Sequence, residues 1–329
     1  MNASAENWVE KIRAGDVRAV SRALTAIENG EADARGVLRE LFPLTGKAWR
    51  IGVTGGAGTG KSTLVSCLAA HYRAQGKTVG VIAVDPSSPF TGGAILGDRI
   101  RMQSHATDDG VFIRSMAARG AWGGLAQAAA DAALLLDAAG KDIVILETVG
   151  VGQDEIEVAR VADCTLVVLV PGSGDEVQNL KAGLMEIADI FVVNKADYEE
   201  AGKFEERLVS IVQLAPPRDR WSPKIVRTVA TEEKGIVELA RDIQAFREVH
   251  GDPNVRRAHD KEYWKNWLIR AIQQRATEEI AAGNFEGRTL NDMAAAVASR
   301  KKDPYAAADE LYSTLRRQAA RSGSIKENS

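Results

Sequence analysis

Residues 55 to 63 read Gly-Gly-Ala-Gly-Thr-Gly-Lys-Ser-Thr and follow a largely apolar run at residues 49 to 54. The pattern G-x-x-x-x-G-K-S between a strand and a helix is typical of a loop that binds the phosphates of a nucleoside triphosphate. Glycines let backbone N–H groups converge on anionic oxygens, and the amino-terminal end of the next helix adds a positive dipole. The predicted binding residues are Gly55, Gly58, Gly60, Lys61, Ser62 and Thr63.

Two side chains of this loop carry the predicted chemistry. We expect Lys61 to reach the β- and γ-phosphates and the Ser62 hydroxyl to ligate Mg²⁺. The motif alone selects neither the base nor the reaction.

The region from about residue 49 to 250 alternates short β-rich runs with helical stretches. Strands are predicted at residues 50–54, 78–84, 111–114, 142–147, 164–170, 189–194 and 224–229. Several are nearly all apolar, as expected of strands buried on both faces. The alternation predicts an α/β fold with a mostly parallel sheet flanked by helices, as in P-loop NTPases.

Helical patterns lie on both sides of that region. Residues 1–44 are predicted to form a helical extension, in which Asp16 and Gly30 bracket one helix as its N-cap and C′ residues. Residues 45–251 are predicted to be the nucleotide-binding domain. Residues 252–329 are predicted to be a helical arm with helices at about 254–282, 288–300 and 304–320.

Composition limits the class of partner. The net charge of -3 argues against a dedicated nucleic-acid binder. The two cysteines, Cys67 and Cys164, lie far apart, which fits a reducing cytosol rather than a disulfide framework. No apolar run approaches the ~20 residues of a membrane span, and the first residues lack signal-peptide features. We therefore expect a cytoplasmic protein without nucleic-acid or membrane partners.

The stretch Asn194-Lys195-Ala196-Asp197 follows a predicted strand and has the N-K-x-D form of guanine-specific NTPases. The Asp197 carboxylate can accept from the guanine N1–H and the exocyclic amine together, whereas adenine has no such donor pair. Lys195 is expected along the base plane, and Asn194 is expected to brace the loop. Order along the chain predicts a second base-side loop at Ala230.

The predicted strand at residues 142–147 ends in Glu147-Thr148-Val149-Gly150, where small GTPases usually have Asp-x-x-Gly. We expect Glu147 to hold Mg²⁺ through water and the Gly150 N–H to sense the γ-phosphate. No Gln directly follows Gly150 to orient water, and Gln153 is a candidate substitute. We therefore predict slow intrinsic hydrolysis that a partner accelerates.

Two further carboxylates, Asp85 and Asp98, are candidate Mg²⁺ or outer-shell ligands, since Mg²⁺ takes one or two carboxylates besides phosphates and water. Asp85 ends a predicted strand, and Asp98 lies in a glycine-flanked loop. Taken singly, each is equally well explained as a helix cap or turn residue.

Short motifs occur in one order along the chain. Besides the phosphate loop they are Asp85-Pro86-Ser87-Ser88, Thr91-Gly92-Gly93, Gly97-Asp98, Arg101-Met102, Arg119-Gly120, Glu147-Thr148-Val149-Gly150-Val151-Gly152-Gln153, Gly174-Asp175-Glu176 and Asn194-Lys195-Ala196-Asp197. This set resembles that of the MeaB family of P-loop GTPases, which also carries the older names ArgK and LAO/AO transport kinase. The resemblance covers about residues 10 to 250.

The resemblance implies a GTPase chaperone of adenosylcobalamin-dependent acyl-CoA mutases such as methylmalonyl-CoA mutase, which it protects and whose cofactor loading it gates. It implies GTP, GDP and Mg²⁺ as ligands and homodimers joined through the helical arm. It assigns phosphate and Mg²⁺ binding to Lys61 and Ser62. It further implies an acidic metal cluster of Asp85, Asp98 and Glu147, and guanine recognition by Asn194, Lys195 and Asp197.

Two other functions stay open. One is an ATP-dependent kinase of a transport system, against which the N-K-x-D motif argues. The other is a metal-inserting GTPase, against which the four scattered histidines argue because none pairs with a cysteine at metal-ligand spacing.

Residues 254 to 275 of the predicted arm carry six basic residues, which are interpreted as a solvated helix face or as a contact with an acidic partner. The same stretch contains Tyr263, Trp264 and Trp267, which are interpreted as a docking or subunit contact.

Overall fold

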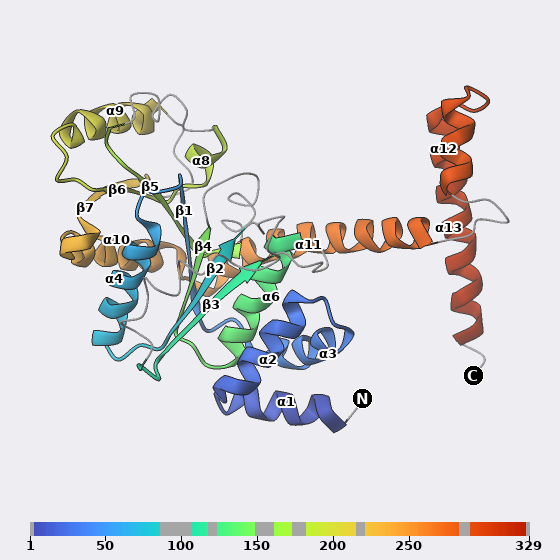
Figure 1. The fold of residues 1–329 in the computed structure, drawn as a ribbon, viewed down its shortest axis with the longest axis horizontal. Helices are drawn as coiled ribbons and strands as arrows, with labels where there is room; N and C mark the ends of the chain where they lie inside the picture. The colour runs from blue at the N-terminus through green and yellow to red at the C-terminus, as the bar shows by residue number, and fades with distance from the viewer. Residues whose placement is uncertain are drawn as a thin grey trace. The chain divides into compact units, whose positions relative to one another are not determined.

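A computed structural model describes residues 3–85, 107–117, 124–148, 161–172, 182–214, 221–282 and 290–326. Its centre is a seven-stranded sheet in the order β3-β2-β4-β1-β5-β6-β7 (Figure 1). All neighbouring strands are parallel. The strands are β1 (Trp49–Gly55), β2 (Val79–Asp85), β3 (Val111–Ala117), β4 (Ile143–Thr148), β5 (Cys164–Leu169), β6 (Ile190–Asn194) and β7 (Lys224–Thr228). The predicted fold class is confirmed.

Side chains alternate between the two faces of the sheet, because successive residues of a strand point in opposite directions. In β5, Leu166 and Val168 belong to one buried cluster, while Val167 and Leu169 belong to another on the opposite face. Every residue of β1, β4, β5 and β6 is buried. The continuous apolar runs in the sequence thus reflect a sheet that is covered on both sides.

Helices form the two covering layers. The first cluster joins the sheet to α4 and α10, and the second joins it to α9, on the face where α6 also packs. Gly80 of β2 approaches α6 so closely that a Cβ there would lie 2.7 Å from Leu136 Cδ1. The bounds are α4 (Lys61–Ala74), α6 (Gly124–Ala138), α8 (Ala182–Ile187), α9 (Ala201–Leu214), η3 (Ala230–Glu232) and α10 (Ile236–His250).

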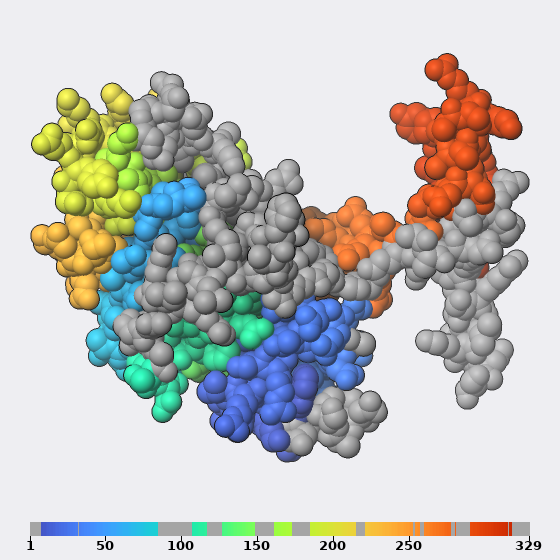
Figure 2. Space-filling model, viewed as in Figure 1, coloured from blue at the N-terminus to red at the C-terminus, as the bar shows by residue number. Residues whose placement is uncertain are grey.

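The helical segment before β1 packs against α6 and β3. It consists of α1 (Ala3–Arg13), α2 (Val17–Glu28), α3 (Ala32–Leu41) and η1 (Phe42–Leu44). As predicted, the Asp16 carboxylate caps α2 by accepting from the Ala19 N–H at 2.8 Å, and Gly30 follows the helix with a φ of 69°. Glu28 of α2 forms an ion pair of 2.8 Å with Arg114 of β3. In Figure 2 the blue surface of these helices adjoins the green surface of α6 and β3.

The chain divides into two compact units, residues 1–259 and 260–329. The second unit contains most of α11 (Pro253–Ala282), together with α12 (Leu290–Ala298) and α13 (Pro304–Lys326). Within it, α12 packs on α13 and buries Met293 and Ala307. Among the described residues, no helix is long and apolar enough to span a membrane.

Candidate nucleotide-binding site

The phosphate-binding loop follows β1, in the middle of the sheet, and leads directly into α4. Two of its glycines are required by close packing and by backbone conformation. Gly55 has a φ of 143°, and a Cβ there would lie 2.2 Å from the Val168 carbonyl oxygen. Gly60 has a φ of 89°, and a Cβ there would lie 2.4 Å from Asn194 Nδ2. Any side chain at either position would therefore displace the loop.

Lys61 is held at the loop by the loop's own backbone. Its ammonium donates to the carbonyl oxygens of Gly55 and Gly56, both at 2.8 Å, although only 6% of the residue is exposed. The Thr59 hydroxyl also donates to Gly56 O, at 2.9 Å. A phosphate oxygen is a stronger acceptor than a neutral carbonyl, so these contacts of the ammonium can be exchanged for contacts with a phosphate.

Ser62 and Glu147 meet at the same end of the sheet. The Ser62 hydroxyl donates to Glu147 Oε1 at 2.6 Å, and both residues are buried. The contact arises because β4 lies beside β1, with Glu147 in register with Val53. A hydroxyl oxygen beside a carboxylate provides ligands that suit Mg²⁺, which prefers hard oxygen atoms.

The other predicted metal and catalytic residues are less fully described. Asp85 ends β2, the neighbour of β4, so its backbone lies at the same edge as Glu147. Asp98, Gly150 and Gln153 lie outside the described residues. Within the ranges that the structure describes, no three His, Cys, Asp or Glu residues form a group that could hold a metal ion.

Asn194 joins three loops at the carboxyl end of the sheet. Its side-chain amide donates to the Thr59 carbonyl at 2.8 Å, and its Oδ1 accepts from the Thr228 hydroxyl at 3.0 Å and from the Ala230 N–H at 3.2 Å. The residue is 2% exposed. Asn194 therefore ties the phosphate loop to the loop after β7.

Lys195 makes a second link between the base-side loop and the phosphate loop. It has a left-handed φ of 54°, and its ammonium donates to the Gly58 carbonyl at 3.0 Å. The next residue, Ala196, donates its N–H to the Thr228 carbonyl at 3.1 Å. The Asp197 side chain is exposed beyond these contacts, where a ligand can reach it.

Thr228 is a site residue that the sequence reading missed. It ends β7 and is paired in register with Asn194, which ends β6. Alignment of the two predicted strand ends would have brought these residues side by side, because carboxyl ends of parallel strands share one edge of the sheet. The sequence gives no comparable indication for the Thr59 carbonyl, because every residue has a backbone carbonyl group.

The opposite end of β1 carries a closed network of charges. Arg50 pairs with Asp163 at 2.7 Å, and Arg256 of α11 pairs with the same carboxylate at 3.1 Å. Arg256 also donates to the Ala48 carbonyl at 2.5 Å, and its guanidinium lies 5.6 Å from the Trp49 ring centroid. Burial alone would raise the pKa of Asp163, but the two guanidinium groups outweigh burial and lower it.

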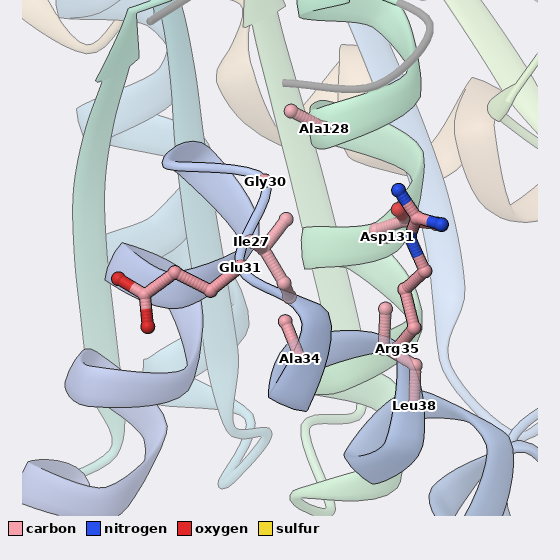
Figure 3. A pocket seen from close by; sticks show the side chains of 8 residues that line it. All are labelled: Ile27, Gly30, Glu31, Ala34, Arg35, Leu38, Ala128 and Asp131. Carbon is pink, nitrogen blue, oxygen red and sulfur yellow. The ribbon is translucent and has the colours of Figure 1, made fainter. Parts of the chain in front are cut away.

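A small cavity lies apart from the phosphate loop, where α2 and α3 pack on α6 (Figure 3). Its volume is about 30 Å³. Its lining includes three charged residues, Glu31, Arg35 and Asp131. Gln127 donates to Asp131 at 2.9 Å. Burial raises the pKa of Asp131 to about 6, against the lowering effects of Gln127 and Arg35.

Comparison with known proteins identifies this combination of fold and loops. The family model of the methylmalonyl-CoA mutase-associated GTPase MeaB matches residues 20–284. A Pyrococcus abyssi protein named for a GTPase activity is 47% identical over 317 residues, covering 94% of this chain and 96% of that protein.

A mouse protein named methylmalonic aciduria type A homolog, mitochondrial, is 33% identical and covers 83% of this chain and 66% of its own length. The crystal structure of an LAO/AO transport system kinase superposes with a TM-score of 0.74 at 28% identity, covering 96% of this chain and 99% of that one. With the phosphate loop on β1 and the N-K-x-D loop on β6, these likenesses agree on one assignment: the chain belongs to the MeaB family of P-loop GTPases and is a guanine-nucleotide-binding GTPase.

Proposed function

We propose that this GTPase serves as a chaperone of an adenosylcobalamin-dependent acyl-CoA mutase, methylmalonyl-CoA mutase or a close relative, protecting the enzyme and gating its cofactor loading. The observation that carries the proposal is the family match over residues 20–284, because that family is named for association with methylmalonyl-CoA mutase. The name of the mouse relative, which refers to methylmalonic aciduria, points to the same substrate chemistry.

The phosphate end of the site would act through position and charge. Lys61 would exchange its two carbonyl contacts for phosphate oxygens and offset charge on the transferred phosphoryl group. Ser62 would ligate Mg²⁺, and Glu147 would hold a water molecule bound to the ion. The Ser62 Oγ and Glu147 Oε1 atoms lie 2.6 Å apart, so both side chains can serve the same ion. Mg²⁺, when bound, would neutralise part of the negative charge of the phosphates. We extend the same assignment to Asp85 and Asp98, and to Gln153 as the group that orients water.

The base would be read by Asp197, with Lys195 along the base plane and Ala230 in the second loop. Support comes from Asn194, which anchors both loops to Thr59 of the phosphate loop. Because Asp197 accepts from two guanine donors, Asp197→Asn should weaken GDP binding about 10- to 100-fold. Glu199→Gln, an exposed acid two residues away, is the matched control and should bind GDP normally.

Competition between GDP and ADP for the wild-type protein checks the base assignment directly. GDP should displace a fluorescent guanine nucleotide, and ADP should not. Normal GDP binding by Asp197→Asn would contradict the assignment of Asp197, and preference for ADP would favour the kinase function.

Regulation by the mutase follows from the lack of a Gln beside Gly150. We expect slow hydrolysis by the isolated protein and a faster rate when a mutase is added. Single-turnover GTP hydrolysis, with each acyl-CoA mutase in turn, measures both rates. Fast GTP hydrolysis by the isolated protein, unchanged by any mutase, would contradict the assignment of a mutase as partner.

We further propose that the protein is a homodimer joined through its helical arm. The arm exposes large apolar side chains on α11 and α13, including Ile272 at 66% and Tyr305 at 83%. Burying such side chains against a second copy would remove apolar area from water. Ile272→Glu with Tyr305→Glu should convert the dimer to a monomer in sedimentation analysis, whereas Lys261→Glu on the same arm should not.

A further inference from the structure

Cys67 lies on α4, the helix that begins with the phosphate-binding lysine, and contacts the second base-side loop. Its sulfur is 3.2 Å from the carbonyl oxygen of Ala230, the first residue of η3. The cysteine is half-buried and packs against the apolar cluster between the sheet, α4 and α10, to which Ala230, 4% exposed, also belongs. A thiol is a weak donor, so the contact is a hydrogen bond from Cys67 to the turn.

The turn that accepts this bond is also hydrogen-bonded to Asn194, the last residue of β6. The Ala230 N–H donates to Asn194 Oδ1 at 3.2 Å, and the Val229 N–H donates to the Lys234 carbonyl at 3.1 Å, which closes the turn. Gly235, the N-cap of α10, follows the turn with a φ of 79°, and a Cβ there would lie 2.1 Å from the Arg227 carbonyl oxygen. Asn194 and Cys67 thus hold the same residue from opposite directions.

We propose that Cys67 is a positioning residue of the guanine site, whose thiol holds the Ala230–Glu232 turn against α4 and so slows nucleotide release. The inference rests on the proposed role of Ala230 in base binding. It adds a link that the nucleotide-binding motifs do not contain, because Cys67 belongs to none of them.

The protonation state of the thiol supports this role. Burial, and after it the nearby charge of Glu233, raises the pKa of Cys67. The group therefore keeps its proton at neutral pH and remains a donor. A thiolate would instead repel the carbonyl oxygen.

The effect of losing the Cys67 thiol should be moderate, because the Ala230 carbonyl oxygen has a second hydrogen-bond donor. Ala230 O also accepts from the Glu233 N–H at 3.3 Å, so loss of the thiol leaves the carbonyl with one donor. Stability should therefore change little. The turn would move more freely against α4, and the GDP dissociation rate should rise about three- to tenfold.

A matched set of variants in the full-length protein tests the hydrogen bond. Cys67→Ala removes the donor, Cys67→Ser keeps a donor of similar size, and Gln75→Ala alters the exposed far end of the same helix. Stopped-flow release of a fluorescent GDP analogue should be about three- to tenfold faster for Cys67→Ala and within about twofold of wild type for the other two. The melting temperatures of the nucleotide-free proteins separate an effect on the site from an effect on folding.

Equal release rates for Cys67→Ala and wild type would overturn the inference, as would equal acceleration by Cys67→Ser, which would indicate lost packing. If Cys67→Ala does not fold, Cys67→Val keeps the volume without the donor and should show the same acceleration. The GDP–ADP competition of the wild type is independent of these variants. A wild type that prefers GDP while Cys67→Ala releases it normally would refute only the role of Cys67; a wild type without that preference would refute the proposed base site.

Discussion

The polar contacts at the amino end of β1 and those of Lys61 at its carboxyl end are built in opposite ways. At its amino end, Arg50 and Arg256 share the Asp163 carboxylate, and the Asp137 carboxylate accepts from the N–H groups of Gly46, Lys47 and Ala48 at 2.6–3.2 Å. These partners come from distant segments of the chain. At its carboxyl end, Lys61 instead binds carbonyl oxygens of its own loop, five and six residues away.

This difference separates contacts that hold the fold from contacts that serve a ligand. Each side chain at the amino end joins two or more elements, so breaking one contact loosens the packing between them. The contacts of Lys61 are local, and a phosphate can replace them without moving another element. Two substitutions test the comparison directly, and a third, at Asp131, tests a carboxylate that lacks two such partners; they follow in order of decreasing expected effect.

Asp163→Asn should have the largest effect, and it should fall on stability. The substitution leaves two guanidinium groups facing a neutral amide, at a side chain that is 3% exposed. Loss of one partner of a buried ion pair costs about 3–5 kcal/mol of the free energy of unfolding. Urea unfolding measures the loss, GDP affinity of the folded protein should be unchanged, and the exposed Asp33→Asn is the control.

The pH dependence of this pair has a defined sign. Because the folded protein lowers the pKa of Asp163, the ion pair contributes its full stability above the unfolded pKa of about 4. That contribution should disappear as pH falls further through the folded pKa. An unfolding free energy of Asp163→Asn equal to that of wild type at pH 7 would contradict the structural role of this network.

Lys61→Ala should have the next largest effect, and it should fall on ligand binding. Removing the ammonium should reduce GTP affinity about 100-fold, which corresponds to roughly 3 kcal/mol. Stability should change little, since the contacts that are lost lie within one loop. Isothermal titration with GTP and a urea titration on the same sample separate the two outcomes, and Lys47→Ala, at the other end of β1, should leave both unchanged.

Asp131 provides a third, smaller test because it is a half-buried carboxylate without the two guanidinium partners of Asp163. Its pKa of about 6 lies above the unfolded value, so the folded state binds the proton more tightly, and stability should fall as pH rises from about 4 to 6. Asp131→Asn removes the charge and should stabilise the protein by about 1–3 kcal/mol at pH 8.

The gain from Asp131→Asn should vanish near pH 4, where wild type is protonated. Unfolding free energies of both proteins across this pH range measure the difference. Asp137→Asn, on the same helix, is the contrast: it weakens an acceptor of three backbone N–H groups and should destabilise the protein at pH 8. A stabilised Asp137→Asn would show that burial, rather than hydrogen bonding, dominates on this helix.

Local patterns were enough to predict the elements. All seven strands and the C-terminal helices form where the periodicity indicates, and Asp16 caps α2 as its position suggests. Asn194 could be singled out from the sequence as a candidate site residue, because N-K-x-D is a contiguous motif. The contacts of Thr228 and Cys67 with the same loops were not readable, since neither residue belongs to a motif.

The sequence by itself determined the phosphate loop, the order of strands and helices along the chain and the N-K-x-D loop, because each depends on neighbouring residues. Only the tertiary structure decided the order of strands in the sheet, the direct hydrogen bond from Ser62 to Glu147 across 85 residues, and the bond from Arg256 to Ala48 across 208 residues. Such contacts depend on which strands lie side by side and how the helices pack on them, which no local pattern records.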